Sequence, residues 1–237
     1  MRPAVSRKRR FYLSLGALIG PMVIAGVTID KRDEKRLLQI GVKDSKQLTP
    51  KKRRQLYREI EKLARSIIVL RVQPCQIDSY RARKISLDRL EAMKMAQIID
   101  MCECKHVYLD ALTMRPKKFG RLVLSYLQNK DKAVKLIAEN FADSTYPVVA
   151  AASIIAKVER DKAVKGIERR VGEPVGVGYP HDPSTVAFVE KLIKQGPLPP
   201  FVRKSWITTQ MLQEKNWQRK LKDFIFRKRE ECKEGKG

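Results

Sequence analysis

The 237-residue chain is poor in the residues that build disulfide scaffolds and zinc sites. Its four cysteines and two histidines include a Cys102-x-Cys104-x-His106 run, but no second ligand pair accompanies it, so neither a disulfide nor a zinc framework is expected. Acidic residues are also scarce, because 26 Asp and Glu stand against 51 Lys and Arg, a net charge of +25. This excess repels cationic partners and favours a polyanion such as nucleic acid.

Long uncharged stretches are rare as well, and the run from Phe11 to Ile29 needs an explanation. Four basic residues precede it, which together with the run gives the outline of a signal anchor. The Gly20-Pro21 break, however, divides the run into two short apolar halves of strand length. We therefore expect two strands joined by a Gly/Pro turn, no membrane partner and a cytoplasmic location.

The rest of the chain alternates between helical and strand patterns, which predicts an α/β fold. Thr49 and Pro50 give a helix start, because threonine caps a helix and proline suits its first position. Helices are expected over residues 50–66, 86–102, 115–128, 147–170, 182–195 and 209–229. Strands are expected over residues 67–74, 106–110 and 133–143. The small residues from Ala150 to Ser153 predict close packing of their helix on a sheet.

Two carboxylates, Asp110 and Asp143, each follow an apolar run and would stand at strand ends, where catalytic groups are often found. Such oxygen ligands suit hard divalent cations, and a cation pair can clamp the two oxygens of a phosphoryl transfer. A structural role is also open from spacing alone. Asp143 could cap the next helix, and Asp110 could be a turn residue.

Six sequence blocks resemble the motifs of a known protein family, which the spacing of the two aspartates alone does not identify. They read GPMVIAGV at 20–27, DSKQLTPKKR at 44–53, VYLDA at 107–111, ADSTYPVVAAASIIAKVERD at 142–161, GVGYPHDPST at 176–185 and VRKSW at 202–206. In these blocks and their order the chain resembles ribonuclease HII of the archaeal type. The resemblance implies an RNase H-like fold, with a mixed five-stranded central sheet flanked by helices.

The same resemblance implies three regions in the chain. Residues 1–10 would be a basic N-terminal segment, residues 11–200 the RNase H-like domain, and residues 201–237 a basic helical extension. That extension contains 11 basic and 5 acidic residues over positions 202–237, a composition suited to nucleic acid or to a solvated helix. A monomer is expected.

The resemblance also implies an activity. Members of the family are endonucleases that cut the RNA strand of RNA/DNA hybrids and ribonucleotides embedded in DNA, using Mg²⁺ or Mn²⁺ held by four carboxylates. By match to the family motifs, Asp110 corresponds to the third ligand and Asp143 to the fourth. Tyr179 resembles the tyrosine that stacks on the deoxyribose beside the ribonucleotide junction.

The N-terminal motif departs from the family pattern. The family opens with Asp-Glu followed by Ala-Gly-Arg-Gly-Pro, and in this register Phe11 and Tyr12 occupy the Asp and Glu positions. Two dications beside only two carboxylates should bind weakly and activate water poorly, so the chain as written is expected to be weakly active or inactive. Because agreement ends abruptly before Gly16, a local frameshift or sequence error is favoured over functional repurposing.

Four lysines and one serine near the motif blocks are candidate substrate contacts. They are Lys43, Ser45 and Lys46 of the DSK turn, Lys157 and Lys204. Positions 43–71 hold 10 basic and 3 acidic residues, which supports an edge that faces phosphates, although each lysine could also be an ordinary solvated charge. A hybrid-binding protein without cleavage and a general RNA-binding protein remain alternatives to the metal-dependent nuclease. Junction preference and metal-dependent cutting distinguish the three.

Overall fold

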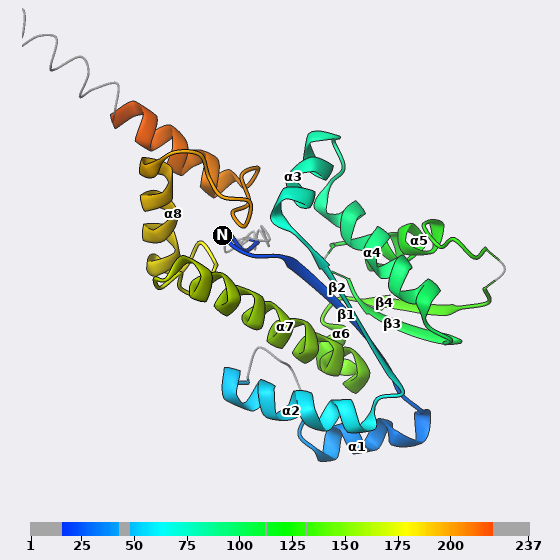
Figure 1. Ribbon diagram of the computed structural model, residues 1–237. Helices are drawn as coiled ribbons and strands as arrows, with labels where there is room; N and C mark the ends of the chain where they lie inside the picture. Colours follow the sequence, from blue (N-terminus) through cyan, green and yellow to red (C-terminus); the bar gives the residue numbers. More distant parts are fainter. Residues whose placement is uncertain (1–15, 43–47, 112, 131, 220–237) are drawn as a thin grey trace, which may run out of the picture.

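The computed structural model describes residues 16–42, 48–111, 113–130 and 132–219 (Figure 1). The strands are β1 (Met22–Thr28), β2 (Ser66–Val72), β3 (His106–Asp110) and β4 (Lys135–Glu139). The helices are η1 (Lys31–Asp33), α1 (Glu34–Gln39), α2 (Pro50–Leu63), α3 (Pro74–Ala82), α4 (Leu87–Met101), α5 (Pro116–Ser125), α6 (Ala142–Thr145), α7 (Pro147–Val171) and α8 (Pro183–Gln195). Residues 207–219 are also helical. The expectations for Phe11, Tyr12, Lys43, Ser45 and Lys46 lie outside the described residues.

The strands form two pairs of opposite kind. β1 and β2 are antiparallel, in a register that sets Met22 opposite Val72 and Thr28 opposite Ser66. β3 and β4 are parallel, as the intervening helix α5 requires, and Asp110 stands opposite Glu139. The mixed α/β architecture expected from the sequence is confirmed, with four strands among the described residues.

The long helix α7 crosses the β1–β2 pair and holds it against α2 (Figure 1). Its small residues Ala150 and Ala151 are buried beside Ile154 and Ile155, and the four belong to one apolar cluster with Leu56 of α2. Small side chains let the helix axis approach the strands closely, as the sequence predicted. This packing fixes the start of α7 at Pro147, four residues after Asp143.

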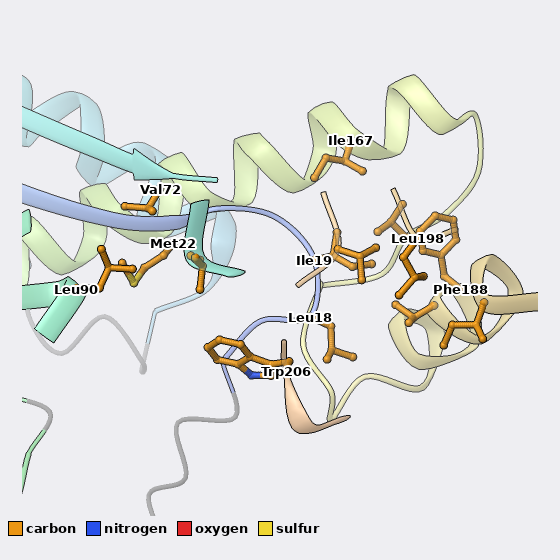
Figure 2. Packing of buried hydrophobic residues seen from close by; sticks show 14 residues of the cluster. Leu18, Ile19, Met22, Val72, Leu90, Ile167, Phe188, Leu198 and Trp206 are labelled. Atoms are coloured by element: carbon orange, nitrogen blue, oxygen red, sulfur yellow. The ribbon is translucent and has the colours of Figure 1, made fainter. Parts of the chain in front are cut away.

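A second apolar cluster brings together parts of the chain that are far apart in sequence (Figure 2). Leu18 and Ile19, which precede β1, are fully buried with Phe188 of α8 and Trp206. Backbone bonds reinforce the contact, because the Gly20 N–H donates to the Phe201 carbonyl at 2.9 Å. The segments before β1 and after α8 therefore form one structural unit.

Most elements agree with the sequence expectations. The Thr49 side chain accepts a bond from the Lys52 N–H, as an N-cap should, with Pro50 in the first turn of α2. The exceptions are η1, α1, α3 and α6, which were not expected; Pro74 follows the end of β2 and starts α3, behind a Gln73 capping box. The strand expected over residues 133–143 is too long, because β4 ends at Glu139 and Asp143 lies in the short helix α6 rather than at a strand end. The second half of the uncharged run forms β1, and no described helix is long and apolar enough to cross a membrane.

Candidate active site

Asp110 and Asp143 come together at one end of the β3–β4 pair. Asp110 is the last residue of β3, and its Oδ1 accepts a hydrogen bond from the Ala142 N–H at 3.2 Å. Asp143 is the next residue along the chain and is only 3% exposed. The bond therefore brings the segment that carries Asp143 next to Asp110, although Ala142 lies 32 positions after Asp110 in the sequence.

The turn between β4 and α6 sets this arrangement. Asn140 Nδ2 donates to the carbonyls of Ala111 and Thr113, which ties the turn to the loop that follows β3. Phe141 then adopts a left-handed conformation, with φ of 60°, and directs the chain into α6. Asp143 does not cap α7, whose N-cap is Tyr146 without a side-chain bond, so the capping interpretation of Asp143 is wrong.

An aromatic pair lies next to the carboxylates. The rings of Tyr108 and Tyr146 are 4.5 Å apart between centroids, and the Tyr146 hydroxyl donates to Glu139 Oε1 at 3.2 Å. Partial burial and the Glu139 carboxylate raise the pKa of the Tyr146 hydroxyl. Tyr146 therefore stays protonated at neutral pH and fixes the chain between α6 and α7.

The candidate ligands among the described residues are of the type that a hard divalent cation prefers, but they are too few to hold it. Asp110 and Asp143 supply oxygen ligands, which Mg²⁺ and Mn²⁺ prefer. Nowhere in the described ranges do three or more His, Cys, Asp or Glu side chains gather in a metal-binding group. Cys102 and Cys104 lie 2.7 Å apart between sulfurs, yet they form no such group with His106.

Tyr179 lies in a glycine loop whose shape is fixed by polar contacts. Gly176 and Gly178 have φ of 76° and 81°, which favour glycine. Asp182 Oδ2 accepts from the Val177 N–H at 2.7 Å, and the Thr185 hydroxyl accepts from the Gly178 N–H at 2.8 Å. The bond from Val177 and one from the Thr185 hydroxyl at 2.8 Å lower the pKa of Asp182, so its carboxylate stays charged and holds the loop.

Arg160 of α7 supports the Tyr179 ring. Its guanidinium carbon lies 3.9 Å from the ring centroid, and His181 stacks on the same tyrosine at 5.4 Å between centroids. Arg160 Nη2 also donates to the Val177 carbonyl at 2.5 Å. The sequence alone did not single out Arg160, because an arginine inside a charged helix resembles a solvated residue; in the structure it is only 9% exposed.

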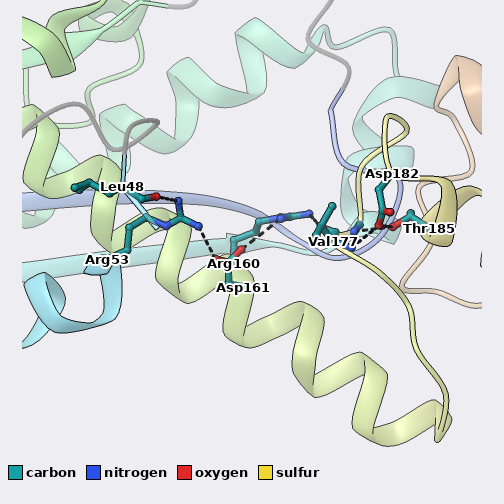
Figure 3. A network of polar contacts seen from close by, with 8 residues as sticks. Leu48, Arg53, Arg160, Asp161, Val177, Asp182 and Thr185 are labelled. Carbon is teal, nitrogen blue, oxygen red and sulfur yellow. Dashed lines mark hydrogen bonds and ion pairs between the residues drawn. The ribbon is translucent and has the colours of Figure 1, made fainter. Parts of the chain in front are cut away.

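A line of polar contacts joins the loop to the start of α2 (Figure 3). Asp161 Oδ2 accepts from Arg53 Nη2 at 3.2 Å, and its Oδ1 lies 3.5 Å from Arg160 Nη1. Arg53 Nη1 in turn donates to the Leu48 carbonyl at 2.9 Å. The described part of the DSKQLTPKKR block, residues 48–53, is thus connected through α7 to the glycine loop.

The remaining candidate residues are spread over this part of the molecule. Lys157 lies on α7 and is half-buried. Lys204 is exposed, and its backbone N–H donates to the Asp78 carboxylate of α3 at 3.0 Å. The neighbouring Arg203 is buried, with Nε donating to the Gly20 carbonyl at 3.3 Å. Burial lowers the pKa of Arg203 to about 10, so the guanidinium keeps its charge at neutral pH.

Comparison with known proteins gives a consistent family. The family model described as Ribonuclease HII matches residues 15–209. Ribonuclease HII of Thermococcus onnurineus is 39% identical over 203 residues, which cover 84% of this chain and 86% of that protein. Ribonuclease HII of Methanothrix thermoacetophila is 39% identical over 198 residues, covering 83% and 92%.

Solved structures agree. Ribonuclease H2 of Pyrococcus horikoshii superposes with a TM-score of 0.76 at 38% identity, over 84% of this chain and 93% of that chain. The ribonuclease HII in the PCNA complex from Archaeoglobus fulgidus gives 0.75 at 36% identity, over 84% and 92%. A Bst ribonuclease HIII solved with Mn²⁺ superposes with a TM-score of 0.68 at 20% identity, over 83% of this chain and 65% of that chain. At this identity the match supports the fold alone. The RNase H-like fold expected from the motif blocks is confirmed.

Proposed function

Because the chain belongs to the ribonuclease HII family, we propose that it is a metal-dependent endonuclease of RNA/DNA hybrids and of ribonucleotides embedded in DNA, weakly active or inactive as written. The observation that carries this proposal is the asymmetry of the site. The glycine loop with Tyr179 is fully built, whereas the described residues contribute only the carboxylates of Asp110 and Asp143 to the cation site.

Recognition rests on surfaces that α7 holds in place. The Arg53–Asp161–Arg160 contacts connect the start of α2 with the Tyr179 loop. The exposed side chains of Lys51 and Arg54 on α2 and of Lys204, together with Lys157, are our candidates for phosphate contacts. Lys43, Ser45 and Lys46, which lie outside the described residues, are further candidates. Such contacts position a duplex without reading its sequence.

Tyr179 supplies the junction preference in this proposal. Its ring is immobilised by Arg160 on the glycine loop, so little conformational entropy is lost when the ring stacks on a sugar. A ring held in this way distinguishes the flexible deoxyribose beside a ribonucleotide from a continuous RNA backbone by shape. Binding would therefore favour the junction over either uniform duplex.

Cleavage would depend on Mg²⁺ or Mn²⁺ held by Asp110 and Asp143. A bound cation would polarise the scissile phosphate and lower the pKa of its water. The Ala142 N–H orients Asp110, and burial excludes water from Asp143, so these two ligands are preorganised. With Phe11 and Tyr12 at the other two family positions, half of the ligand charge is missing, and both cation affinity and turnover should fall.

A hybrid-binding protein that has lost cleavage is the second candidate, and the same asymmetry of the site favours it. The test uses a DNA duplex with one embedded ribonucleotide, beside all-DNA and continuous hybrid duplexes, at millimolar Mg²⁺ and Mn²⁺. We expect tight binding that prefers the junction, weaker binding in Tyr179→Ala, and cutting that is slow or absent. Equal binding to all three duplexes would contradict the proposal and favour a general RNA-binding protein. Rapid cutting that disappears in Asp110→Ala would show that other groups replace the missing ligands.

A further inference from the structure

Phe141 is a large apolar side chain that the fold exposes beside the candidate ligands. It lies in the turn after β4, and 53% of its surface is exposed. Its backbone has φ of 60°, a left-handed conformation that is costly for a bulky residue and easier for glycine or asparagine. The chain therefore holds an exposed aromatic ring at a position where neither burial nor backbone preference favours one.

Backbone bonds connect Phe141 to both candidate ligands. Phe141 directly precedes Ala142, whose N–H donates to Asp110 Oδ1 at 3.2 Å, and it stands two positions before Asp143. Its own carbonyl accepts a bond from the Ser144 N–H at 2.9 Å, which closes the turn into α6. The backbone of Phe141 is thereby fixed next to the carboxylates.

The same turn is joined to a second exposed segment, residues 114–121. Asn140 Nδ2 donates to the Thr113 carbonyl at 2.8 Å, so this segment starts next to the turn that carries Phe141. Met114, its first residue, is 95% exposed. Four exposed basic side chains follow, and residues 111–130 contain no Asp or Glu. They are Arg115, Lys117, Lys118 and Arg121. A polyanion is the partner that this charge fits.

The chemistry of the site selects the part of a nucleic acid that the ring can contact. This step rests on the proposed function, in which Asp110 and Asp143 hold cations against a phosphate of the duplex. The bases of a duplex are stacked on one another, so a ring reaches their flat faces only after unstacking them. The sugars lie beside each phosphate and are accessible from the grooves. The nearest apolar surface for the ring is therefore the sugar next to that phosphate.

We propose that Phe141 is a substrate-binding residue, whose ring packs on the sugar next to the phosphate at Asp110 and Asp143, while the basic side chains of residues 114–121 contact flanking phosphates. The contact is separate from that of Tyr179, which lies on the glycine loop between α7 and α8. It explains the conformation of Phe141, because residues held in costly backbone conformations cluster at binding sites. A ring on a sugar needs no cation, so the contact can be tested without any cleavage.

Binding of the full chain to a DNA duplex with one embedded ribonucleotide, measured in EDTA, tests the inference. We expect Phe141→Asn to bind about five- to tenfold more weakly, the scale of one ring contact, and Phe141→Trp to bind as tightly as the unmodified chain. Asparagine tolerates the left-handed conformation, so the melting temperature of Phe141→Asn should not fall. The matched control is Met101→Asn, which replaces another exposed apolar side chain, before the end of β3 opposite Asp110, and should leave binding unchanged.

The outcomes separate this inference from the proposed function. Unchanged binding by Phe141→Asn, in a chain whose binding weakens in Tyr179→Ala, would overturn the inference and leave the proposed function intact. Weaker binding that comes with a matching fall in melting temperature would give the ring a structural role and would also overturn the inference. An unmodified chain that binds no duplex would overturn both.

Cross-linking locates the ring on the duplex directly. A benzophenone amino acid in place of Phe141, which captures nearby C–H bonds, should cross-link to a sugar next to the embedded ribonucleotide. The same amino acid in place of Met101 should give no cross-link to the duplex. Cross-links from position 141 that are spread evenly along the duplex, or that form only within the protein, would overturn the inference.

Discussion

Replacing Arg160 with methionine should destabilise the protein strongly, because this side chain makes three contacts at once. The change removes the bond from Nη2 to the Val177 carbonyl, the stacking on Tyr179 and the interaction with Asp161. A hydrogen bond from a charged group contributes about 1.5–3 kcal/mol, and a desolvated cation–π contact up to about 2 kcal/mol. Methionine recovers part of the apolar contact, so we expect a loss of about 2–4 kcal/mol.

Urea unfolding of the full chain measures this loss, and thermal unfolding should show a midpoint lowered by roughly 5–15 °C. The control is Arg170→Met on the exposed last turn of the same helix, which should change the free energy of unfolding by less than about 0.5 kcal/mol. Equal effects of the two substitutions would refute the structural role of Arg160. An unchanged m-value is expected, since neither substitution alters the surface exposed on unfolding.

Three further substitutions test other parts of the structure. Burial raises the pKa of Glu91 from its ordinary 4.5 to about 7. The stability that this group contributes is therefore fully present below pH 4.5 and is lost as the pH rises through 7. In urea titrations, the stability of Glu91→Gln relative to the unmodified chain should increase by roughly 3 kcal/mol between pH 4.5 and 8. Gly176→Ala should lower the melting temperature and weaken junction binding, because the new methyl group meets Asp182 and Thr185 at a left-handed position. Lys204→Ala should weaken binding to all duplexes and reduce the slope of log affinity against log salt by about one.

Local sequence signals predicted most of the helices. The cap at Thr49 and the small residues of α7 act within a few residues of the chain, so they can be read without tertiary information. α3 was missed because Pro74 is compatible both with the end of a strand and with the first turn of a helix. Only the packing of Ile77 in the core distinguishes the two.

The site was predicted in part. The sequence predicted Asp110 at a strand end, as the structure has it, whereas Asp143 lies in α6; the bond from the Ala142 N–H to Asp110 brings the two segments together. The support of Tyr179 by Arg160 depends on a contact between residues 19 positions apart, and the register of β1 with β2 joins residues still farther apart. Such long-range contacts leave no periodic signal in a single sequence.

The central claim is that the recognition surface is complete and the cation site is not. The most direct measurement compares cutting of a duplex with one embedded ribonucleotide by the unmodified chain, by the double variant Phe11→Asp with Tyr12→Glu, and by that variant carrying Asp110→Ala. The account predicts little or no cutting by the unmodified chain, clear metal-dependent cutting by the double variant, and loss of that cutting when Asp110 is removed. Efficient, Asp110-dependent cutting by the unmodified chain, with no gain in the double variant, would contradict it.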